Sequence, residues 1–540
     1  HHVHRRRIAD LIPAGRKRGW QRVVVQGKTD HPFIALGKQM NAQPEKPSAT
    51  REPSYFDALL PLVTLVVLIA ASLSLFGMDA TKGPLQVALL LTSMVTAAVV
   101  LKNGHRWDAV AEAASQGIAS VTTAIFILLG VGALIGTWNM SGTIPTMVYY
   151  GIQMMSPDWF YLATVVICGA ISMGIGSSWT TAGTIGVGLV GLSTLLGLSP
   201  TITAGAVISG AYFGDKLSPL SETTILTAQL TGNDIYAHLR AQAWTSVPAM
   251  LIAIIVFACI GFFGQAATVD GGVMATELEQ LKDMFWITPL NLLPLAFLIV
   301  LSLKKVPPSL AITASAMVAG VLAAFLQPQV VLDFVDSPEL SSPAAFVKGT
   351  WLAMSSGFQA NTGTPAVDSL LSRGGMDSML LTIWLIIGAL AFGTMLDKFG
   401  LLSKLITPVL LRAKTTGKLI GTVAATALGL NIIAGDQYIA LVLPARLFQV
   451  EFRKRGLSTA NLSRAVADAG TVTSPLVPWN SCGAYMAAVL GVPTLMYLPF
   501  CIFNIASPVL SVIYGFTGFK ITRMAPEAGS VQVPPAATDS

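Results

Sequence analysis

Long apolar runs, separated by short polar segments, fill most of the chain between positions 57 and 519. A helix rises 1.5 Å per residue and the hydrocarbon core of a bilayer is about 30 Å thick, so about 20 apolar residues can cross it. The pattern therefore predicts an all-α protein, a polytopic membrane helical bundle. The predicted spans are residues 57–76, 85–101, 120–140, 159–173, 244–263, 285–303, 309–325, 378–396 and 498–519.

Two further apolar stretches, residues 174–232 and 419–489, are interrupted by Gly, Ser, Thr, Pro and Asp. Pro lacks a backbone N–H and Gly adopts unusual dihedral angles, so a membrane helix can unwind at such positions. Unwound backbone at membrane depth is tolerated only where it is buried in protein or lines a water-filled cavity. We therefore predict broken or re-entrant helices in both stretches, with function at the breaks.

Short matches at a constant spacing predict an internal repeat. Gly132-Ala-Leu recurs at Gly388 and Ser218-Pro-Leu recurs at Ser474, in both cases 256 residues later. Loops rich in Lys and Arg mark the cytoplasmic side of a membrane. Placing the basic loops inside and the acidic segments 265–284 and 327–343 outside puts both termini in the cytoplasm and makes the repeats run in opposite directions. The basic segments are the N-terminal tail, Lys102 with Arg106, Arg240, Lys304 with Lys305, and residues 398–418.

Inverted repeats with paired helix breaks are typical of secondary transporters, although a duplication kept for packing alone is an alternative. The chain then divides into five parts. Residues 1–53 form a polar, basic N-terminal tail, in which Met40 is a candidate start and the residues before it are a candidate artefact. Residues 54–264 form the first membrane repeat, residues 265–345 external loops with a linking helix pair, and residues 346–519 the second membrane repeat. Residues 520–540, rich in Pro, Ala and Ser, predict a disordered C-terminal tail.

Composition excludes a soluble protein. Hydrophobic residues make up 53% of the chain and charged residues only 11%, with a mean hydropathy of +0.66, whereas soluble domains average about 25% charged residues. The net charge of +6 resides in tails and loops, where it sets orientation, so we expect no nucleic-acid partner. The four cysteines show no CxxC spacing, which argues against a metal site or disulfides. All six histidines lie in the N-terminal tail or in predicted loops, so we expect proton carriers within the bilayer to be Asp or Glu.

The segment from Gly210 to Thr224 concentrates charge in apolar surroundings. A charged side chain at mid-bilayer costs several kcal/mol and usually marks an ion path. Carboxylate, hydroxyl and carbonyl oxygens are the ligands that hard cations prefer. The candidate ion- and proton-binding residues here are Asp215, Ser218, Glu222, Thr223 and Thr224, with Lys216 in a secondary role.

The second repeat carries similar chemistry with fewer charges. Asp436 and Gln437 lie at the predicted turn of an apolar hairpin, and Asp468 begins a segment that prolines interrupt. The candidates here are Asp436, Asp468, Ser474 and Asn480, with Gln437 secondary; the first repeat adds Ser177, Ser178 and Thr180 as neutral oxygen donors.

Structural interpretations of these residues stay open. Asp215 can pair with Lys216 or with a distant Arg. Asp468 can be held by Arg464 one turn earlier. Ser and Thr hydroxyls inside helices commonly bond helix carbonyls, so each hydroxyl alone is more often structural than a ligand.

Four segments carry a family resemblance: Ser178-Trp-Thr-Thr-Ala-Gly-Thr-Ile-Gly, Gly214-Asp-Lys-Leu-Ser-Pro-Leu-Ser-Glu-Thr-Thr, Gly435-Asp-Gln-Tyr and Thr473-Ser-Pro-Leu-Val-Pro-Trp-Asn-Ser-Cys-Gly-Ala-Tyr. Together they resemble the NhaC-type sodium/proton antiporters of the ion-transporter superfamily, over nearly the whole membrane region. The resemblance implies a multi-pass antiporter of the cell inner membrane, driven by the proton gradient and without a cofactor. Two positions depart from the family pattern, Glu222 where Asp is usual and Thr180 where Gly is frequent, which bears on ion preference and kinetics.

We therefore expect a secondary active transporter in which Asp215, Glu222 and Asp436 bind either sodium or protons. One alternative is a sodium- and proton-coupled exchanger of organic ions, of the malate/lactate or amino-acid type. Another is an intramembrane aspartyl protease, because Gly-Asp occurs twice in the core, but the extra Gly that such proteases use is missing. No HExxH, Walker, Rossmann or nucleophile-elbow motif occurs in a supporting context, so we expect no enzyme. The expected partners are membrane lipid, sodium and protons, and the oligomeric state stays open.

Overall fold

The computed structural model describes residues 50–264 and 271–524. These residues form an all-α fold, whose single β-contact is an isolated bridge between Leu457 and Arg523. The predicted N-terminal tail up to residue 49, residues 265–270 of the predicted external loop, and the predicted C-terminal tail from residue 525 onward lie outside the described residues.

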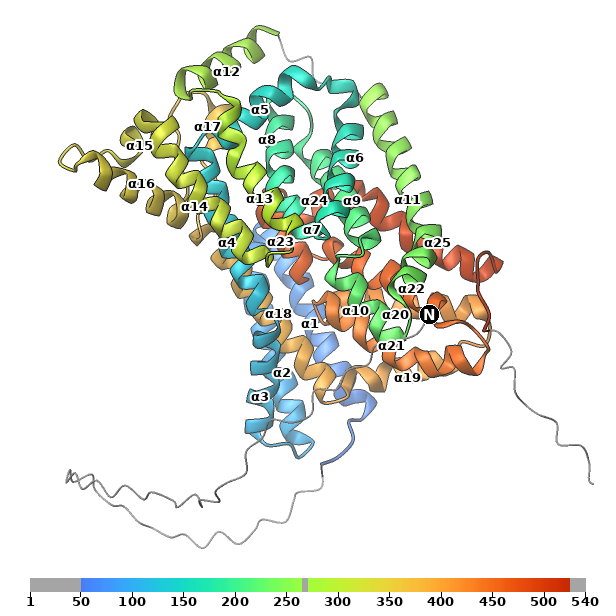
Figure 1. The fold of residues 1–540 in the computed structure, drawn as a ribbon. Helices are drawn as coiled ribbons and strands as arrows, with labels where there is room; N and C mark the ends of the chain where they lie inside the picture. Colours follow the sequence, from blue (N-terminus) through green and yellow to red (C-terminus); the bar gives the residue numbers. More distant parts are fainter. Residues whose placement is uncertain (1–49, 265–270, 525–540) are drawn as a thin grey trace, which may run out of the picture. The chain divides into compact units, whose positions relative to one another are not determined.

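The helices of the first half cluster into long spans and short pieces (Figure 1). A π-helical segment, Ala182–Gly186, joins α7 to α8. The helices are α1 (Tyr55–Phe76), α2 (Pro84–Lys102), α3 (Trp107–Ser120), α4 (Thr122–Met140), α5 (Thr143–Met154), α6 (Pro157–Ile175), α7 (Ser178–Thr181), α8 (Val187–Leu195), α9 (Pro200–Leu217), α10 (Glu222–Thr231), α11 (Ile235–Phe263) and α12 (Gly271–Met284).

The second half follows a similar order. Its π-helical segment, Ala467–Thr471, extends α22 and contains Asp468. The helices are α13 (Leu293–Leu303), α14 (Pro308–Leu326), α15 (Pro328–Val335), α16 (Ser342–Ser356), α17 (Pro365–Leu371), α18 (Leu380–Lys398), α19 (Leu401–Arg412), α20 (Thr416–Ile433), α21 (Gln437–Lys454), α22 (Thr459–Val466), α23 (Ser481–Leu490), α24 (Thr494–Tyr497) and α25 (Ile502–Thr517).

Eight helical stretches of the described chain are long and apolar enough to cross a membrane. They confirm the predicted spans at α1, α2, α4, α6, α11, α14 and α18, and add α20. Two predicted spans are broken instead. Run 285–303 belongs to a pair bent by 87° before Pro289, and run 498–519 begins within a piece bent by 91° from α23. Prolines at these bends, Pro289 and Pro493, lack the N–H that a continuous helix needs.

Helix starts recur at a fixed spacing in the two halves. Ser177 caps α7 and Asp436 caps α21, 259 residues later. Ser221 caps α10 and Asn480 caps α23, again 259 residues apart. The backbone therefore repeats more regularly than the residue identities do.

The sequence match at a spacing of 256 reflects a local shift. Ser218 and Ser474 both follow the last helical turn before a break. In the second half the helix before this serine is three residues shorter and the break after it three residues longer, counted between the caps Ser199 and Ser221 and the caps Ser458 and Asn480.

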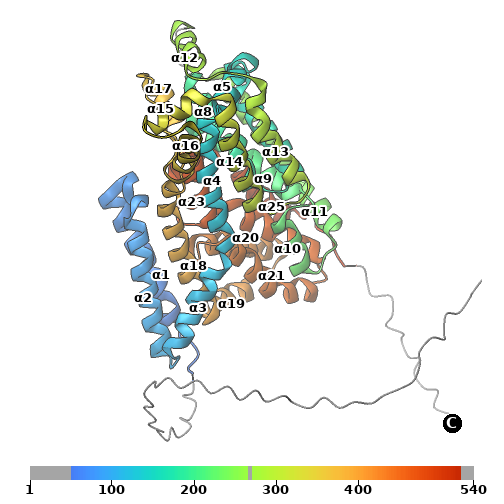
Figure 2. The same cartoon turned by 60° about the vertical axis from the view of Figure 1, so that its left-hand side comes forward.

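The two halves run in opposite directions. Figures 1 and 2 place α3 near the bottom and α5 near the top, so α4 between them runs upward. They place α17 near the top and α19 near the bottom, so the equivalent α18 runs downward. The halves also interlock, because α4 packs against α14 and α16 whereas α18 packs against α2 and α3. The predicted bundle with inverted repeats and broken helices is confirmed.

Glycines bring the broken helices together at two points. A Cβ at Gly214 of α9 would lie 2.3 Å from the carbonyl oxygen of Gly169, so only glycine permits this approach of α9 to α6. Gly176 ends α6 with φ +78°, and a Cβ there would lie 2.9 Å from the backbone carbon of Leu220. The start of α7 is thereby held against the break between α9 and α10.

Candidate ion-binding site

Four helices start within the interrupted stretches, and each has a capping side chain. The caps are Ser177, Ser221, Asp436 and Asn480. Each accepts a backbone N–H of its own first turn, at 3.0 to 3.4 Å. A capped helix start fixes its side chains and presents the positive end of the helix dipole to its surroundings. The first three caps line the same cavity.

Asp215 is held by the start of α7. It lies in the last turn of α9 with 7% of its surface exposed. One carboxylate oxygen accepts the hydroxyl of Ser178 at 2.6 Å and the backbone N–H of Ser178 at 3.1 Å. Asp215 therefore does not pair with its neighbour Lys216. Its charge is stabilised by a helix start, and its other oxygen makes no hydrogen bond that blocks a ligand.

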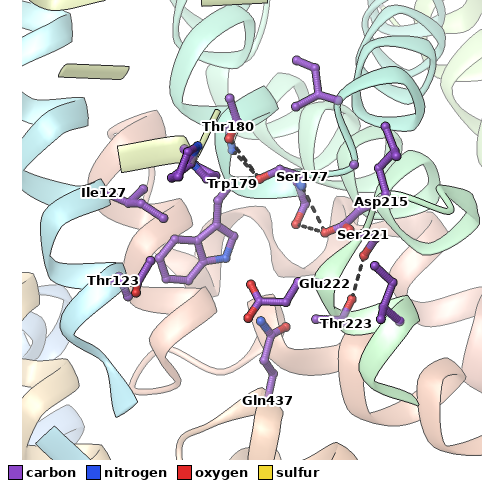
Figure 3. Close-up of a pocket in the computed structure, with 18 of the residues that line it drawn as sticks. Thr123, Ile127, Ser177, Trp179, Thr180, Asp215, Ser221, Glu222, Thr223 and Gln437 are labelled. Atoms are coloured by element: carbon purple, nitrogen blue, oxygen red, sulfur yellow. Dashed lines mark hydrogen bonds between the residues drawn. The ribbon is translucent and has the colours of Figure 1, made fainter. Parts of the chain in front are cut away.

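A cavity of about 620 Å³ lies between these elements. Asp215, Glu222 and Asp436 all line it, from α9, α10 and the cap of α21. Asp436 is 5% exposed, whereas Glu222 is an exposed residue. Figure 3 shows the Glu222 carboxylate in the open space between Trp179 and Gln437. Residues predicted from both repeats thus meet at one cavity.

The three carboxylates share this cavity without forming a ready-made metal site. Among the described residues, no three His, Cys, Asp or Glu side chains are close enough to hold one metal ion. The structure therefore does not bring all three predicted ligands around a single sodium ion. A cation in the cavity would combine a carboxylate with neutral oxygens, of which the predicted residues Ser177, Ser178, Thr180, Thr223 and Gln437 also line it.

The opposite wall comes from two breaks that the sequence did not single out. Ser120 and Thr123 line it where α3 gives way to α4, and Ser302 and Lys305 line it where α13 turns into α14. Lys305 has φ +60°, a left-handed conformation that favours glycine. It is the one basic side chain in the lining as described, and sequence analysis had counted it only as a charge that sets orientation.

Several predicted residues lie outside the cavity lining and serve the backbone. Thr224 donates to the carbonyl of Lys216 at 3.1 Å, and Ser474 donates to the carbonyl of Thr471 at 2.7 Å. The hydroxyl of Ser218 accepts the N–H of Leu220 at 3.2 Å. Asn480 caps α23. These contacts are structural, as expected of isolated hydroxyls and amides at helix breaks.

Asp468 is also outside the cavity. It is fully buried and forms a salt bridge with Lys216, which is 1% exposed. Thr245 and Ser507 donate to the same carboxylate oxygen at 2.9 and 3.0 Å. Arg464, the partner considered from the sequence, instead donates to a backbone carbonyl.

His238 corrects the expectation that every histidine lies in a tail or loop. It is fully buried in the first turn of α11, where its ring hydrogen-bonds to Ser463 at 2.9 Å and to Gln242. Helix α11 begins at Ile235, well before the apolar run starting at Trp244. The cap Asp234, followed by an uninterrupted helical pattern, is the signal that would have extended this helix.

Comparison with known proteins agrees with this geometry. Residues 24–229 and 210–519 match the model of the Na+/H+ antiporter family. The chain is 36% identical over 423 residues to the Na(+)/H(+) antiporter NhaC of Alkalihalophilus pseudofirmus, covering 77% of this chain and 87% of that protein. It is 34% identical to the Na(+)/H(+) antiporter NhaC of Bacillus subtilis, covering 80% and 92%. It is 33% identical to the Malate-2H(+)/Na(+)-lactate antiporter of Bacillus subtilis, covering 87% and 96%.

Proposed function

Because the chain belongs to the Na+/H+ antiporter family, we propose that it exchanges sodium ions for protons at the cavity lined by Asp215, Glu222 and Asp436. It is a multi-pass membrane protein. The basic loops support a location in the cell inner membrane with both termini in the cytoplasm. Sodium and protons are the substrates, and the reaction needs no cofactor.

The observation that carries this proposal is the convergence of carboxylates from both repeats on one cavity. Inverted repeats place a transport site at their interface, so that alternate movement of one part against the other opens it to either side. Asp215 and Glu222 belong to the first repeat, and Asp436 belongs to the second. A cation bound between them touches both repeats.

Competition for the same oxygens couples the two fluxes. A carboxylate in protein surroundings binds a proton more readily than one in water, because burial disfavours its charge. A sodium ion beside it favours the charged form and so expels the proton. Protons arriving from the acidic side release sodium in the same way. Exchange follows without a step in which both ions are bound to one carboxylate.

The neutral side chains set the geometry of this exchange. Ser178 holds one oxygen of Asp215 through two hydrogen bonds, which leaves the other oxygen for a ligand. Asp436 accepts the N–H groups of Tyr438 and Ile439 at 3.2 and 3.3 Å, so its carboxylate stays ionised more easily than burial alone allows. Both acids are thereby oriented before the cation arrives.

Transport in proteoliposomes tests the proposal, with sodium, potassium, malate and lactate gradients compared side by side. We expect a sodium gradient alone to drive proton flux. Asp215→Asn should abolish this flux with normal expression, whereas Asp158→Asn, an exposed acid in the first turn of α6, should leave it intact. Full sodium-driven proton flux in Asp215→Asn would reject the site.

Exchange of an organic ion is a second candidate, supported by the size of the cavity and by Lys305 in its wall. A volume of about 620 Å³ exceeds what a bare sodium ion needs. Lys305 offers a cation to a carboxylate substrate. If malate or lactate gradients drive sodium or proton flux in the same proteoliposomes, and this flux requires Lys305, the second candidate replaces the first.

A further inference from the structure

Lys216 follows Asp215 in α9 but takes part in a different network. Its ammonium donates to Asp468 and, at 2.9 Å, to the hydroxyl of Ser507. Asp468 also accepts the hydroxyl of Thr245 at 2.9 Å. The network joins α9 and α11 of the first repeat to the π-helical segment Ala467–Thr471 and α25 of the second, and none of its members lines the cavity.

One carboxylate in this network faces two buried cations. Arg464 lies one turn before Asp468, is 2% exposed, and forms no salt bridge within the described chain. Its guanidinium lies 5.8 Å from the ring of Tyr514 on α25, and His238 is the titratable group on α11. A guanidinium stays charged at physiological pH, whereas a buried lysine can lose its proton. Lys216 can therefore become neutral while Arg464 remains as a counter-charge for Asp468.

A buried polar row on α11 leads to this pair. His238, Gln242, Thr245 and Ser246 recur with helical spacing, so they share one face. All four are fully buried. His238 and Gln242 are hydrogen-bonded to each other, and Thr245 contacts Asp468. A membrane helix with such a face is costly unless the groups are used, because polar side chains inside the bilayer are expensive and usually functional.

The second oxygen of Asp468 gives an independent indication. Oδ2 is buried and has no hydrogen-bond partner in the structure as described, while Oδ1 is shared by Lys216, Thr245 and Ser507. Leaving a buried charged acceptor unsatisfied costs at least about 1–3 kcal/mol. A carboxylate in a purely structural ion pair would be expected to have both oxygens satisfied. One unsatisfied oxygen fits a group that changes its protonation during the reaction.

We propose that Lys216 and Asp468 form a second proton-carrying site of the antiporter, separate from the cation cavity. In one state the lysine is an ammonium that donates to Asp468. In the other it has released one proton along the polar row of α11 and is an amine, with Arg464 balancing the carboxylate. The proton returns to the same nitrogen when the cycle reverses. The inference rests on the proposed sodium/proton exchange and adds a proton to it.

Helix α9 couples this site to the cavity. Asp215 and Lys216 are consecutive residues on it, and Thr224 of α10 donates to the carbonyl of Lys216 at 3.1 Å. A sodium ion bound near Asp215 and Glu222 therefore acts on Lys216 through its field and through the shared backbone. Loss of the lysine proton and arrival of the cation favour each other.

The proton-to-sodium ratio tests the inference. It is obtained in proteoliposomes at clamped voltage from the pH gradient that just balances an imposed sodium gradient. We expect the double variant Lys216→Gln/Asp468→Asn to keep sodium transport and to lose one proton per sodium ion. The matched control is Lys102→Gln/Asp57→Asn, which removes a Lys–Asp pair of 2.7 Å away from the cavity and should leave the ratio unchanged. An unchanged ratio in the first variant overturns the inference, whereas a wild type without sodium-driven proton flux overturns the proposed function instead.

A milder variant decides the matter if the double variant does not fold. Thr245→Val removes one hydrogen bond to Asp468 without changing charge or size. The carboxylate then holds the shared proton more tightly, so the pH of half-maximal transport should move to the alkaline side. Thr92→Val removes a buried hydroxyl of α2 that bonds only its own helix at 2.7 Å and serves as the control. Identical pH profiles for the two single variants would overturn the inference.

Discussion

The two halves of the molecule start their broken helices at equivalent positions but place different chemistry there. In the first half the caps Ser177 and Ser221 are neutral, and the carboxylates come from Asp215 and Glu222 beside them. In the second half the carboxylate, Asp436, is itself the cap. Ser, Asp and Asn cap helices almost equally well. A cap can therefore gain or lose a charge while the helix keeps its start, and a symmetric backbone comes to hold an asymmetric ion site.

Asp436→Asn should have the largest effect among changes to these caps. Asparagine keeps the capping hydrogen bonds and removes only the charge. We expect sodium-driven proton flux to fall about 100-fold or more, because removing one charge from a buried interaction costs about 3 kcal/mol or more. Flux measured in inverted vesicles at matched expression checks this.

A second aspartate cap provides the control. Asp234 caps α11 through two hydrogen bonds of 3.0 and 3.1 Å, is exposed, and lies outside the cavity lining. Asp234→Asn should transport normally. Equal losses in both variants would show that capping, and not the charge in the cavity, is what transport needs.

Ser178→Ala should shift the pH dependence by about one unit. The change removes the 2.6 Å hydroxyl bond to Asp215 and keeps the backbone N–H bond. A charge-assisted hydrogen bond is worth about 1.5–3 kcal/mol, and one pH unit corresponds to about 1.4 kcal/mol. The carboxylate then holds its proton to higher pH, so the profile moves to the alkaline side. Ser93→Ala, which removes a helix-internal bond in α2, should leave the profile in place.

Ser177→Asp would make the first half resemble the second. The new carboxylate would cap α7 as Asp436 caps α21 and would add a negative charge to the cavity. We expect the sodium KM to fall roughly fivefold, since a charge a few ångströms away in wet surroundings contributes about 1 kcal/mol. Ser199→Asp, at the cap of α9 outside the lining, should not change the sodium KM. A raised KM in Ser177→Asp would contradict the additive role of the carboxylates.

Lys305→Met should have the smallest effect. Removing this cation from the cavity wall should lower the sodium KM about two- to threefold at low salt, and less at high salt, because exposed charges are screened. Lys304→Met is a matched control with the same charge and an adjacent position outside the lining. If both variants changed the KM equally, the effect would come from general surface charge.

The sequence predicts the membrane spans well because span length and apolar content are local properties. The breaks near Pro219 and Pro475 are predicted for the same reason, since Pro and Gly act on their own backbone. The first half's meeting with Asp436 needed the family resemblance or the repeat, because no local pattern brings α9 and α21 together. The depth of a polar residue is not local either, and this explains the error at His238, whose helix turn is buried only through its packing against α22.

Partners across the fold were the least predictable part of the site. Lys216 and Asp468 are 252 residues apart in the chain, and each has a nearer candidate of opposite charge, Asp215 and Arg464. Helix packing, not sequence distance, selects the pair. Lys305 reaches the cavity only because a hairpin between α13 and α14 turns there, which hydropathy does not reveal.

Sodium binding to the purified protein at several pH values, with released protons counted, tests the central claim most directly. If sodium and protons compete for the cavity carboxylates, binding of sodium must release protons, and its Kd must rise as the pH falls, approaching tenfold per unit for each proton displaced. A sodium Kd that stays constant across pH, with no proton release, would contradict the account.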